Sequence, residues 1–236
     1  AAGVAYAVLV QPSAYGPDHR YLLRTVSEYP GRFLPIGLVD PAAADGAAAA
    51  VALARNGCVG LRVNLALDLR VAATQAAATA WAAFEALDVP VCVRAVPAHH
   101  NLVIGILTRH RRLRLVVDHL GLPEPGHLAA AVPRVAQLAT FEHCWLKIAG
   151  LPRFSQTTPP YRDTWPLVHT AIQSFGASRL LWGSDFPATD PDLGYAAAIQ
   201  AIESMPFVGA DDRIRLMSGT SRELWGVPVE RSTRWQ

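Results

Sequence analysis

Short apolar segments recur along this chain about every 25–30 residues, a rhythm that indicates repeated strand-and-helix units. Several are apolar almost throughout, as is typical of parallel strands that are buried on both faces. The predicted strands occupy residues 5–12, 33–40, 58–65, 89–97, 113–121, 143–151 and 179–187. Segments with helical patterning lie between and after them, at 18–29, 45–56, 74–87, 127–139, 161–175, 194–204 and 211–224. The alternation restricts the chain to α/β folds with a parallel sheet.

Seven such units in 236 residues fit a (β/α)8 TIM barrel that lacks its first strand. We expect one domain over residues 1–236, because no linker or charged run interrupts the pattern. The alternative is an open doubly wound sheet, but no glycine-rich phosphate loop follows any predicted strand. The chain begins "AAGVAYAVLV", without methionine and with a strand almost at once, so we expect the barrel to be truncated at its N-terminus.

Charge and cysteine content limit the binding partners and the cellular compartment that we expect for this chain. The formal net charge of +2 gives no reason to expect a nucleic-acid or membrane partner. No apolar run approaches the roughly 20 residues needed to cross a bilayer, and no signal peptide is evident. The three cysteines are odd in number and widely spaced, which favours free thiols in a reducing, cytoplasmic setting. The sequence predicts no particular oligomeric state.

One predicted strand carries polar residues on a single face. Active sites of such barrels lie at the carboxyl ends of the strands, and strand side chains alternate between the barrel interior and the helix layer. Arg62 and Asn64 alternate with the apolar residues of 58–65 and should therefore point into the barrel mouth. An inward arginine needs an anion nearby, either a substrate group or a carboxylate such as Asp40 or Asp118.

Two further strands end on residues that suit catalysis. In "LRLVVDHLG" either Asp118 or His119 points inward, and His119 is the stronger candidate for chemistry, with a core or loop histidine as the alternative. In "RLLWGSDFP" Asp185 shares a face with Gly183, whose small size leaves room beside the carboxylate. The alternative is that Asp185 caps the turn ahead of Pro187.

Weaker candidates lie near the same mouth. Arg94 ends one strand, Arg153 follows another, and Tyr15 lies in the loop after the first predicted strand; each is otherwise an ordinary loop residue. The chain contains no GxSxG, HExxH or CxxC motif. It also contains no HxH pair, which would belong to the missing first strand.

Five segments in a fixed order carry a family resemblance. They are "VQPSAYGPDHRYLL", "YPGRFLPIGLVDP", "VVDHLGLPE", "WLKIAGLPRFS" and "LLWGSDFP", and the tail "DDRIRLMSGTSRELWG" adds to them. Together they resemble the amidohydrolase-related family of TIM-barrel hydrolases over essentially the whole chain. The likeness is greatest to its lactonase branch, which contains 2-pyrone-4,6-dicarboxylate, sulfomuconolactone and sugar-lactone hydrolases.

The resemblance implies a role for each matching residue. Asp185 would activate water, and His119 would bind a metal or the substrate carbonyl. Arg62 and Arg153 would hold substrate carboxylates, and Tyr15 would contact the substrate. If a divalent ion such as zinc or manganese is bound, His119 and Asp185 are its expected ligands; other members of the branch work without a metal.

The expected activity is hydrolysis of a lactone or similar cyclic ester of a carboxylated, anionic small molecule, with water activated at Asp185. Leu122 and Ala188 depart from the residues that the pyrone dicarboxylate lactonases favour, which argues against that particular substrate. The alternatives are a decarboxylase of the same family, which would release carbon dioxide instead of opening a ring, and an inactive truncated remnant.

Overall fold

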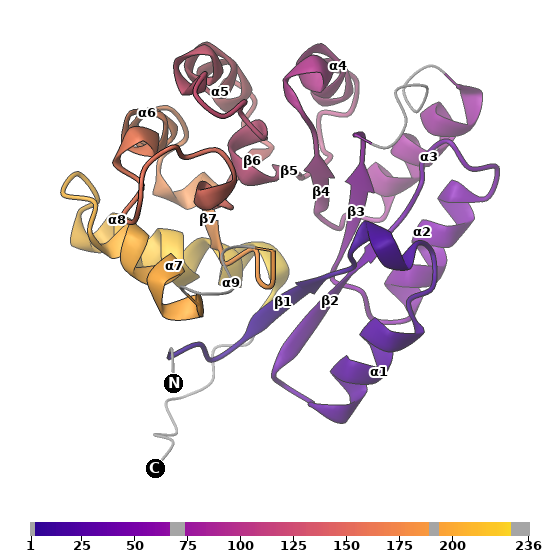
Figure 1. Ribbon diagram of the computed structural model, residues 1–236. Helices are drawn as coiled ribbons and strands as arrows, with labels where there is room; N and C mark the ends of the chain where they lie inside the picture. The colour runs from indigo at the N-terminus through magenta and orange to yellow at the C-terminus, as the bar shows by residue number, and fades with distance from the viewer. Residues whose placement is uncertain (1–2, 67–73, 189–193, 228–236) are drawn as a thin grey trace.

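The computed structural model describes residues 3–66, 74–188 and 194–227, and these build a curved parallel sheet with helices along its outer side (Figure 1). Each strand pairs in parallel with the next in sequence, in the order β1 to β7. The strands are β1 (Ala7–Val10), β2 (Phe33–Leu38), β3 (Gly60–Asn64), β4 (Val91–Arg94), β5 (Leu115–Val117), β6 (Cys144–Ala149) and β7 (Leu180–Gly183). Every strand lies inside a predicted one. Within the described residues the sheet is that of a (β/α)8 barrel without its first strand, which confirms the predicted fold class.

The helices of the described residues alternate with these strands. They are α1 (Arg20–Glu28), α2 (Gly46–Arg55), α3 (Gln75–Ala86), α4 (His100–Arg109), α5 (Val132–Ala139), α6 (Trp165–Phe175), α7 (Gly194–Glu203), α8 (Ala210–Ile214) and α9 (Thr220–Trp225). In the described part of the chain, no helix combines the length and the apolar character that a bilayer crossing demands.

Strand alternation separates two apolar clusters, one on each face of the sheet. On β3, Leu61 and Val63 face the helices and belong to the larger cluster, which also contains most buried helix residues. The smaller cluster lies on the inner face and gathers one residue from each of several strands, namely Ile36, Cys92, Val116 and Leu181. The inner face is therefore apolar along its lower part, and the polar residues are confined to the carboxyl ends of the strands.

The C-terminal helix α9 fills the lower part of the inner face. Trp225, which is 5% exposed, packs with the inner-face cluster. A Cβ atom on Gly60, the first residue of β3, would lie 2.8 Å from the Trp225 ring and 2.8 Å from the carbonyl oxygen of Pro90. Glycine at this position is thus what lets the indole approach the sheet.

Three predicted helices are divided in the structure, and one of them, predicted at 161–175, is a 3₁₀ turn, Arg162–Thr164, followed by α6. The segment predicted at 127–139 is a 3₁₀ turn, Leu128–Ala131, followed by α5. Pro133 explains the division, because proline lacks an N–H group and is tolerated in the first turn of a helix but not in its interior. The segment predicted at 211–224 is α8 and α9 joined by one π-helical stretch, Arg215–Gly219.

Replacing Trp225 by alanine should destabilise the fold strongly, because it removes the largest side chain of the inner-face cluster. We expect the free energy of unfolding to fall by about 3–5 kcal/mol, measured by urea denaturation. Ile214→Ala is the matched control, since Ile214 lies on the neighbouring α8 and is 64% exposed. Equal stability of the two variants would show that Trp225 does not anchor α9.

Candidate active site

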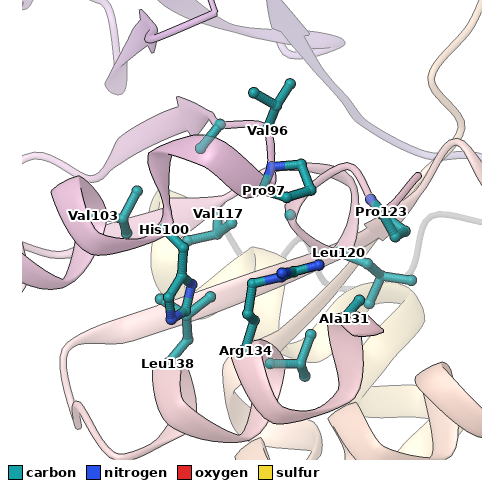
Figure 2. A pocket seen from close by; sticks show the side chains of 13 residues that line it. Val96, Pro97, His100, Val103, Val117, Leu120, Pro123, Ala131, Arg134 and Leu138 are labelled. Atoms are coloured by element: carbon teal, nitrogen blue, oxygen red, sulfur yellow. The ribbon is translucent and has the colours of Figure 1, made fainter. Parts of the chain in front are cut away.

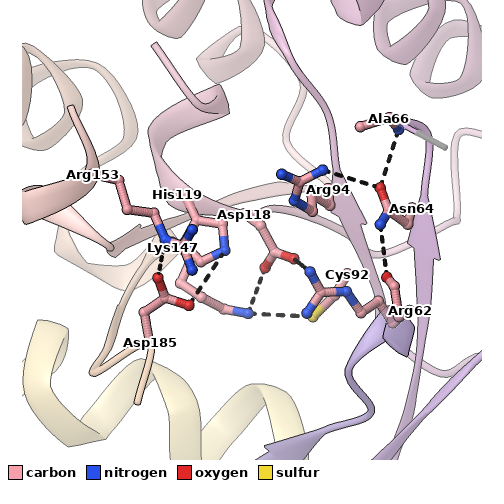
Figure 3. A network of polar contacts seen from close by, with 11 residues as sticks. Arg62, Asn64, Ala66, Cys92, Arg94, Asp118, His119, Lys147, Arg153 and Asp185 are labelled. Carbon is pink, nitrogen blue, oxygen red and sulfur yellow. Dashed lines mark hydrogen bonds and ion pairs between the residues drawn. The ribbon is translucent and has the colours of Figure 1, made fainter. Parts of the chain in front are cut away.

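Polar side chains from five successive strands converge at the carboxyl ends of the sheet (Figure 3). They come from β3, β4 and β6 and from the residues that follow β5, β6 and β7. The set is Arg62, Asn64, Arg94, Asp118, His119, Lys147, Arg153 and Asp185. Its members divide into a buried group at the base, made of Asp118, Lys147 and Arg62, and two groups nearer the open end, one around Asp185 and one of Arg94 with Asn64.

The base of the site is a salt bridge between Asp118 and Lys147. Lys147 Nζ lies 2.6 Å from Asp118 Oδ1, and the Asp118 side chain is only 1% exposed. Arg62 approaches from the other side, with Nη2 3.6 Å from Asp118 Oδ2. The stem of Lys147 runs past Gly183, where a Cβ atom would lie 3.3 Å from Lys147 Cδ. Gly183 thus leaves room for the lysine beneath the site.

Both partners of this salt bridge remain charged. Burial opposes ionisation of Asp118, but the positive charges of Lys147 and Arg62 outweigh it and hold the Asp118 pKa well below its usual range. Burial likewise favours the neutral amine of Lys147, and the Asp118 carboxylate overcomes it and raises the lysine pKa. Cys92 Sγ lies 3.6 Å from Lys147 Nζ, and burial raises the pKa of its thiol to about 11. Cys92 therefore stays protonated beside the pair at neutral pH.

Asp185 lies beyond the end of β7, between His119 and Arg153. Its Oδ2 accepts a hydrogen bond from Arg153 Nε, and its Oδ1 lies 3.9 Å from His119 Nε2. The Asp185 side chain is 14% exposed, in contrast to the fully enclosed Asp118. Of the two carboxylates, Asp185 is thus the one that a small molecule at the strand ends can reach.

His119 follows β5 in a left-handed backbone conformation, with φ of 53°. Burial lowers the pKa of its imidazole, and the nearby carboxylates of Asp118 and Asp185 only partly oppose that shift. The ring is therefore neutral at pH 7. Its Nδ1 atom is buried and makes no hydrogen bond within the described residues, whereas Nε2 faces Asp185.

Arg94 and Asn64 form the opposite side of the site. They are partners in the register of β3 and β4, and Arg94 Nη1 donates a hydrogen bond to Asn64 Oδ1 at 3.4 Å. Asn64 Nδ2 in turn donates to Ser13 Oγ at 2.7 Å. Burial, and then the like charges of Arg62 and Arg153, lower the Arg94 pKa. Within the described residues, Arg94 forms no salt bridge with a carboxylate, so its charge is available to a ligand.

The structure brings most of the predicted residues together and leaves one apart. Arg62 pairs with Asp118, which is the alternative left open for it in the sequence. Tyr15 is 54% exposed and stacks on Tyr21, with ring centroids 6.0 Å apart. Its neighbour Ser13, in the same 3₁₀ turn, is the residue that reaches the site.

Lys147 is the site residue that the sequence reasoning missed. It is the single lysine of the chain and stands inside an otherwise apolar strand, "CWLKIA". A charge that alternation places on an inner face demands a buried counter-charge, so the lone lysine marks a site residue, although its position does not say which carboxylate it meets.

The described residues do not by themselves form a metal site. Within them, no three His, Cys, Asp or Glu side chains are grouped so that they could hold an ion. His119 Nε2 and Asp185 offer two donors, and the oxygens of Asp118 face Lys147 and Arg62.

A separate depression lies on the helix side of the sheet, between α4 and α5 (Figure 2). Its lining is mostly apolar, and His100 and Arg134 are the polar side chains that Figure 2 places beside it. None of the eight polar residues of the site lines this depression, so it is separate from the candidate active site.

Comparison with known proteins gives consistent matches. The profile of the family described as Amidohydrolase matches residues 1–227. The chain is 30% identical to L-fucono-1,5-lactonase of Burkholderia ambifaria, over 95% of this chain and 81% of that protein. It is 26% identical to 4-sulfomuconolactone hydrolase of Hydrogenophaga intermedia, over 79% of this chain and 62% of that protein. A Pseudomonas putida crystal structure provisionally named 2-pyrone-4,6-dicarboxylic acid hydrolase superposes with a TM-score of 0.81 at 27% identity, over 96% of this chain and 84% of its own.

Replacing Lys147 by methionine should leave the Asp118 carboxylate buried with only the more distant Arg62 opposite it. We expect a loss of about 3–5 kcal/mol in the free energy of unfolding at pH 7, measured by urea denaturation. Arg24→Met is the control, because its ion pair with Glu28 is exposed and such pairs contribute less than about 1 kcal/mol. Similar stabilities of the two variants would contradict a structural role for the buried pair.

The deficit of Lys147→Met should also depend on pH. In the wild type the lowered Asp118 pKa adds stability that is present above the unfolded value of about 3.9 and is lost as pH falls below it. In the variant, burial is less opposed and raises the Asp118 pKa, which favours the protonated acid. The difference in unfolding free energy should therefore be largest at pH 7 and shrink below about pH 4.

Proposed function

Because the chain belongs to the Amidohydrolase family, we propose that it is a hydrolase that opens the ring of a lactone. This membership confirms the family expected from the sequence motifs. The lactonase assignment is supported by the matches to L-fucono-1,5-lactonase and 4-sulfomuconolactone hydrolase. The observation that carries it is the Asp185 carboxylate, held by Arg153 and facing a neutral His119 at the strand ends.

In this proposal Asp185 is the general base. Its Oδ2 is fixed by Arg153, which leaves Oδ1, the oxygen nearer His119, to accept a proton from the attacking water. Because burial keeps the His119 imidazole neutral, its Nε2–H group can donate a hydrogen bond to the lactone carbonyl. That donor stabilises the negative charge that develops on the carbonyl oxygen as water adds.

Ring opening then completes the reaction. The tetrahedral intermediate expels the ring oxygen, and the proton taken up by Asp185 returns to that oxygen as the C–O bond breaks. One lactone and one water give one hydroxy acid, and no oxidant or other reactant is consumed. The fold already holds Asp185, His119 and Arg153 in place, so these side chains need little reorganisation during the reaction.

We also propose that the substrate carries an anionic group besides its ester, a carboxylate or a sulfonate. Four basic side chains of the site face two carboxylates, which leaves two positive charges uncompensated; the basic ones are Arg62, Arg94, Lys147 and Arg153, and the acidic ones are Asp118 and Asp185. Arg94 is the best placed to bind such a group, because it is hydrogen-bonded to Asn64 and forms no salt bridge within the described residues. A bidentate carboxylate would offset the burial, and then the repulsion by Arg62 and Arg153, that lower the Arg94 pKa.

Asp185→Asn should abolish lactone hydrolysis with little loss of stability, because it keeps the shape of the side chain and removes the base. We expect kcat to fall by about 10²-fold or more in a spectrophotometric assay of ring opening. Asp211→Asn on the exposed first turn of α8 is the matched control and should keep full activity. A folded Asp185→Asn protein with near wild-type kcat would remove Asp185 from the mechanism.

Arg94→Met should impair binding of charged lactones and spare neutral ones. Loss of a charge-assisted contact should raise KM for a carboxylated or sulfonated lactone by about 10–100-fold. KM for a neutral sugar lactone should stay within a factor of two, and Arg109→Met on the exposed end of α4 should change neither value. An equal rise in KM for both classes of lactone would show that Arg94 supports the structure of the site and does not bind the anionic group.

A further inference from the structure

Gly150 stands at the point where the three residues around the proposed base meet. It directly follows β6, and it precedes the 3₁₀ turn Leu151–Arg153. Its backbone is left-handed, with φ of 70° and ψ of 27°, and its carbonyl oxygen accepts a hydrogen bond from the Arg153 N–H at 2.9 Å. The turn at Gly150 thus carries Arg153 back towards the strand ends.

The space beside Gly150 is occupied by three different side chains. A Cβ atom there would lie 3.1 Å from Arg153 Cδ, 3.1 Å from Asp185 Oδ2 and 3.2 Å from His119 Nδ1. Those neighbours come from the segments that follow β6, β7 and β5 respectively. Each distance is shorter than an ordinary van der Waals contact, so a methyl group would push at least one of the three aside.

None of the three side chains can retreat without losing a contact that the site depends on. His119 is buried, with its Nδ1 enclosed. Asp185 is held through Oδ2 by Arg153, and it is this oxygen that the added methyl would meet. Arg153 Cδ is the carbon next to the nitrogen that donates to Asp185. Any displacement therefore changes the orientation of the carboxylate relative to the imidazole.

We infer that Gly150 is a positioning residue for the hydrolysis, and this inference rests on the function proposed above for Asp185 and His119. The missing side chain is what allows the guanidinium, the carboxylate and the imidazole to come together around one point. A shift of a fraction of an ångström at the base is enough to lower the rate, since misplacement by about 1 Å can cost about 10²-fold.

A matched control separates this steric role from backbone strain. Gly226 ends α9 with φ of 65° and ψ of 34°, nearly the conformation of Gly150, and a Cβ atom there would meet no atom within 4 Å. Alanine at either position carries the same left-handed strain, but only at position 150 does its methyl group enter the site. Asparagine tolerates left-handed backbone better than alanine and still places a Cβ atom at the same point.

The test compares Gly150→Ala, Gly150→Asn and Gly226→Ala with the wild type, using L-fucono-1,5-lactone and 4-sulfomuconolactone as probes. We expect both Gly150 variants to lose about 10–100-fold in kcat, with KM within about a factor of three, because Arg94 and Asn64 are untouched. The melting temperature of Gly150→Ala should fall at least as far as that of Gly226→Ala, because both carry the backbone strain and only the first adds a steric contact, and Gly226→Ala should keep wild-type kcat. A wild-type kcat in Gly150→Ala, or an equal loss in Gly226→Ala, would overturn the inference.

Crystal structures of the same variants keep this test separate from the proposed function. If the wild type opens neither lactone, the functional proposal fails, but the geometry can still be examined. We expect the Arg153–Asp185 hydrogen bond to be broken or His119 to be displaced in Gly150→Ala, and both to be unchanged in Gly226→Ala. A Gly150→Ala structure in which all three side chains keep their places would show that Gly150 does not position them.

Discussion

The salt bridge between Asp118 and Lys147 is the interaction on which the rest of the site depends. Either charge alone would be strongly destabilised by burial, but paired with each other both groups remain ionised. The pair joins β6 to the residue that follows β5, and it gives Arg62 a carboxylate to face from β3. With these charges placed at the base, Arg94 and Arg153 are left to act nearer the open end.

Two carboxylates at the same strand ends thus have different environments. Asp118 is enclosed and faces two cations, so its proton affinity is too low for it to accept a proton from water. Asp185 is partly exposed, faces one guanidinium, and lies beside an imidazole that burial keeps neutral. The difference arises from burial and from the number of cations, not from residue type, and it assigns a structural role to one aspartate and the proposed basic role to the other.

The sequence predicts the sheet better than it predicts the site. Each strand is a run of apolar residues, and such a run by itself predicts a strand that is buried on both faces. Alternation within β3 also predicts correctly that Arg62 and Asn64 point inward. Which anion Arg62 meets depends on the distance between β3 and the end of β5, and no local pattern encodes that distance. Lys147 was missed for the same reason, because its partner lies 29 residues away in the chain.

The proposed reactive side chains lie on turns beyond the strand ends, where strand alternation no longer determines their direction. His119 and Asp185 have φ of 53° and 55°, and Gly150 joins them in the left-handed region. For a residue other than glycine this conformation costs about 1–3 kcal/mol, and it persists only where the surrounding structure enforces it. At His119 the turn reverses the direction that the pleat would give the side chain, because Leu115 and Val117 of the same strand face the helices. With Asp185 and Arg153, it brings side chains from three separate segments together beside Gly150. The strained residues are thus the ones that bring the proposed reactive groups together, and the regular strands below them hold these turns in place.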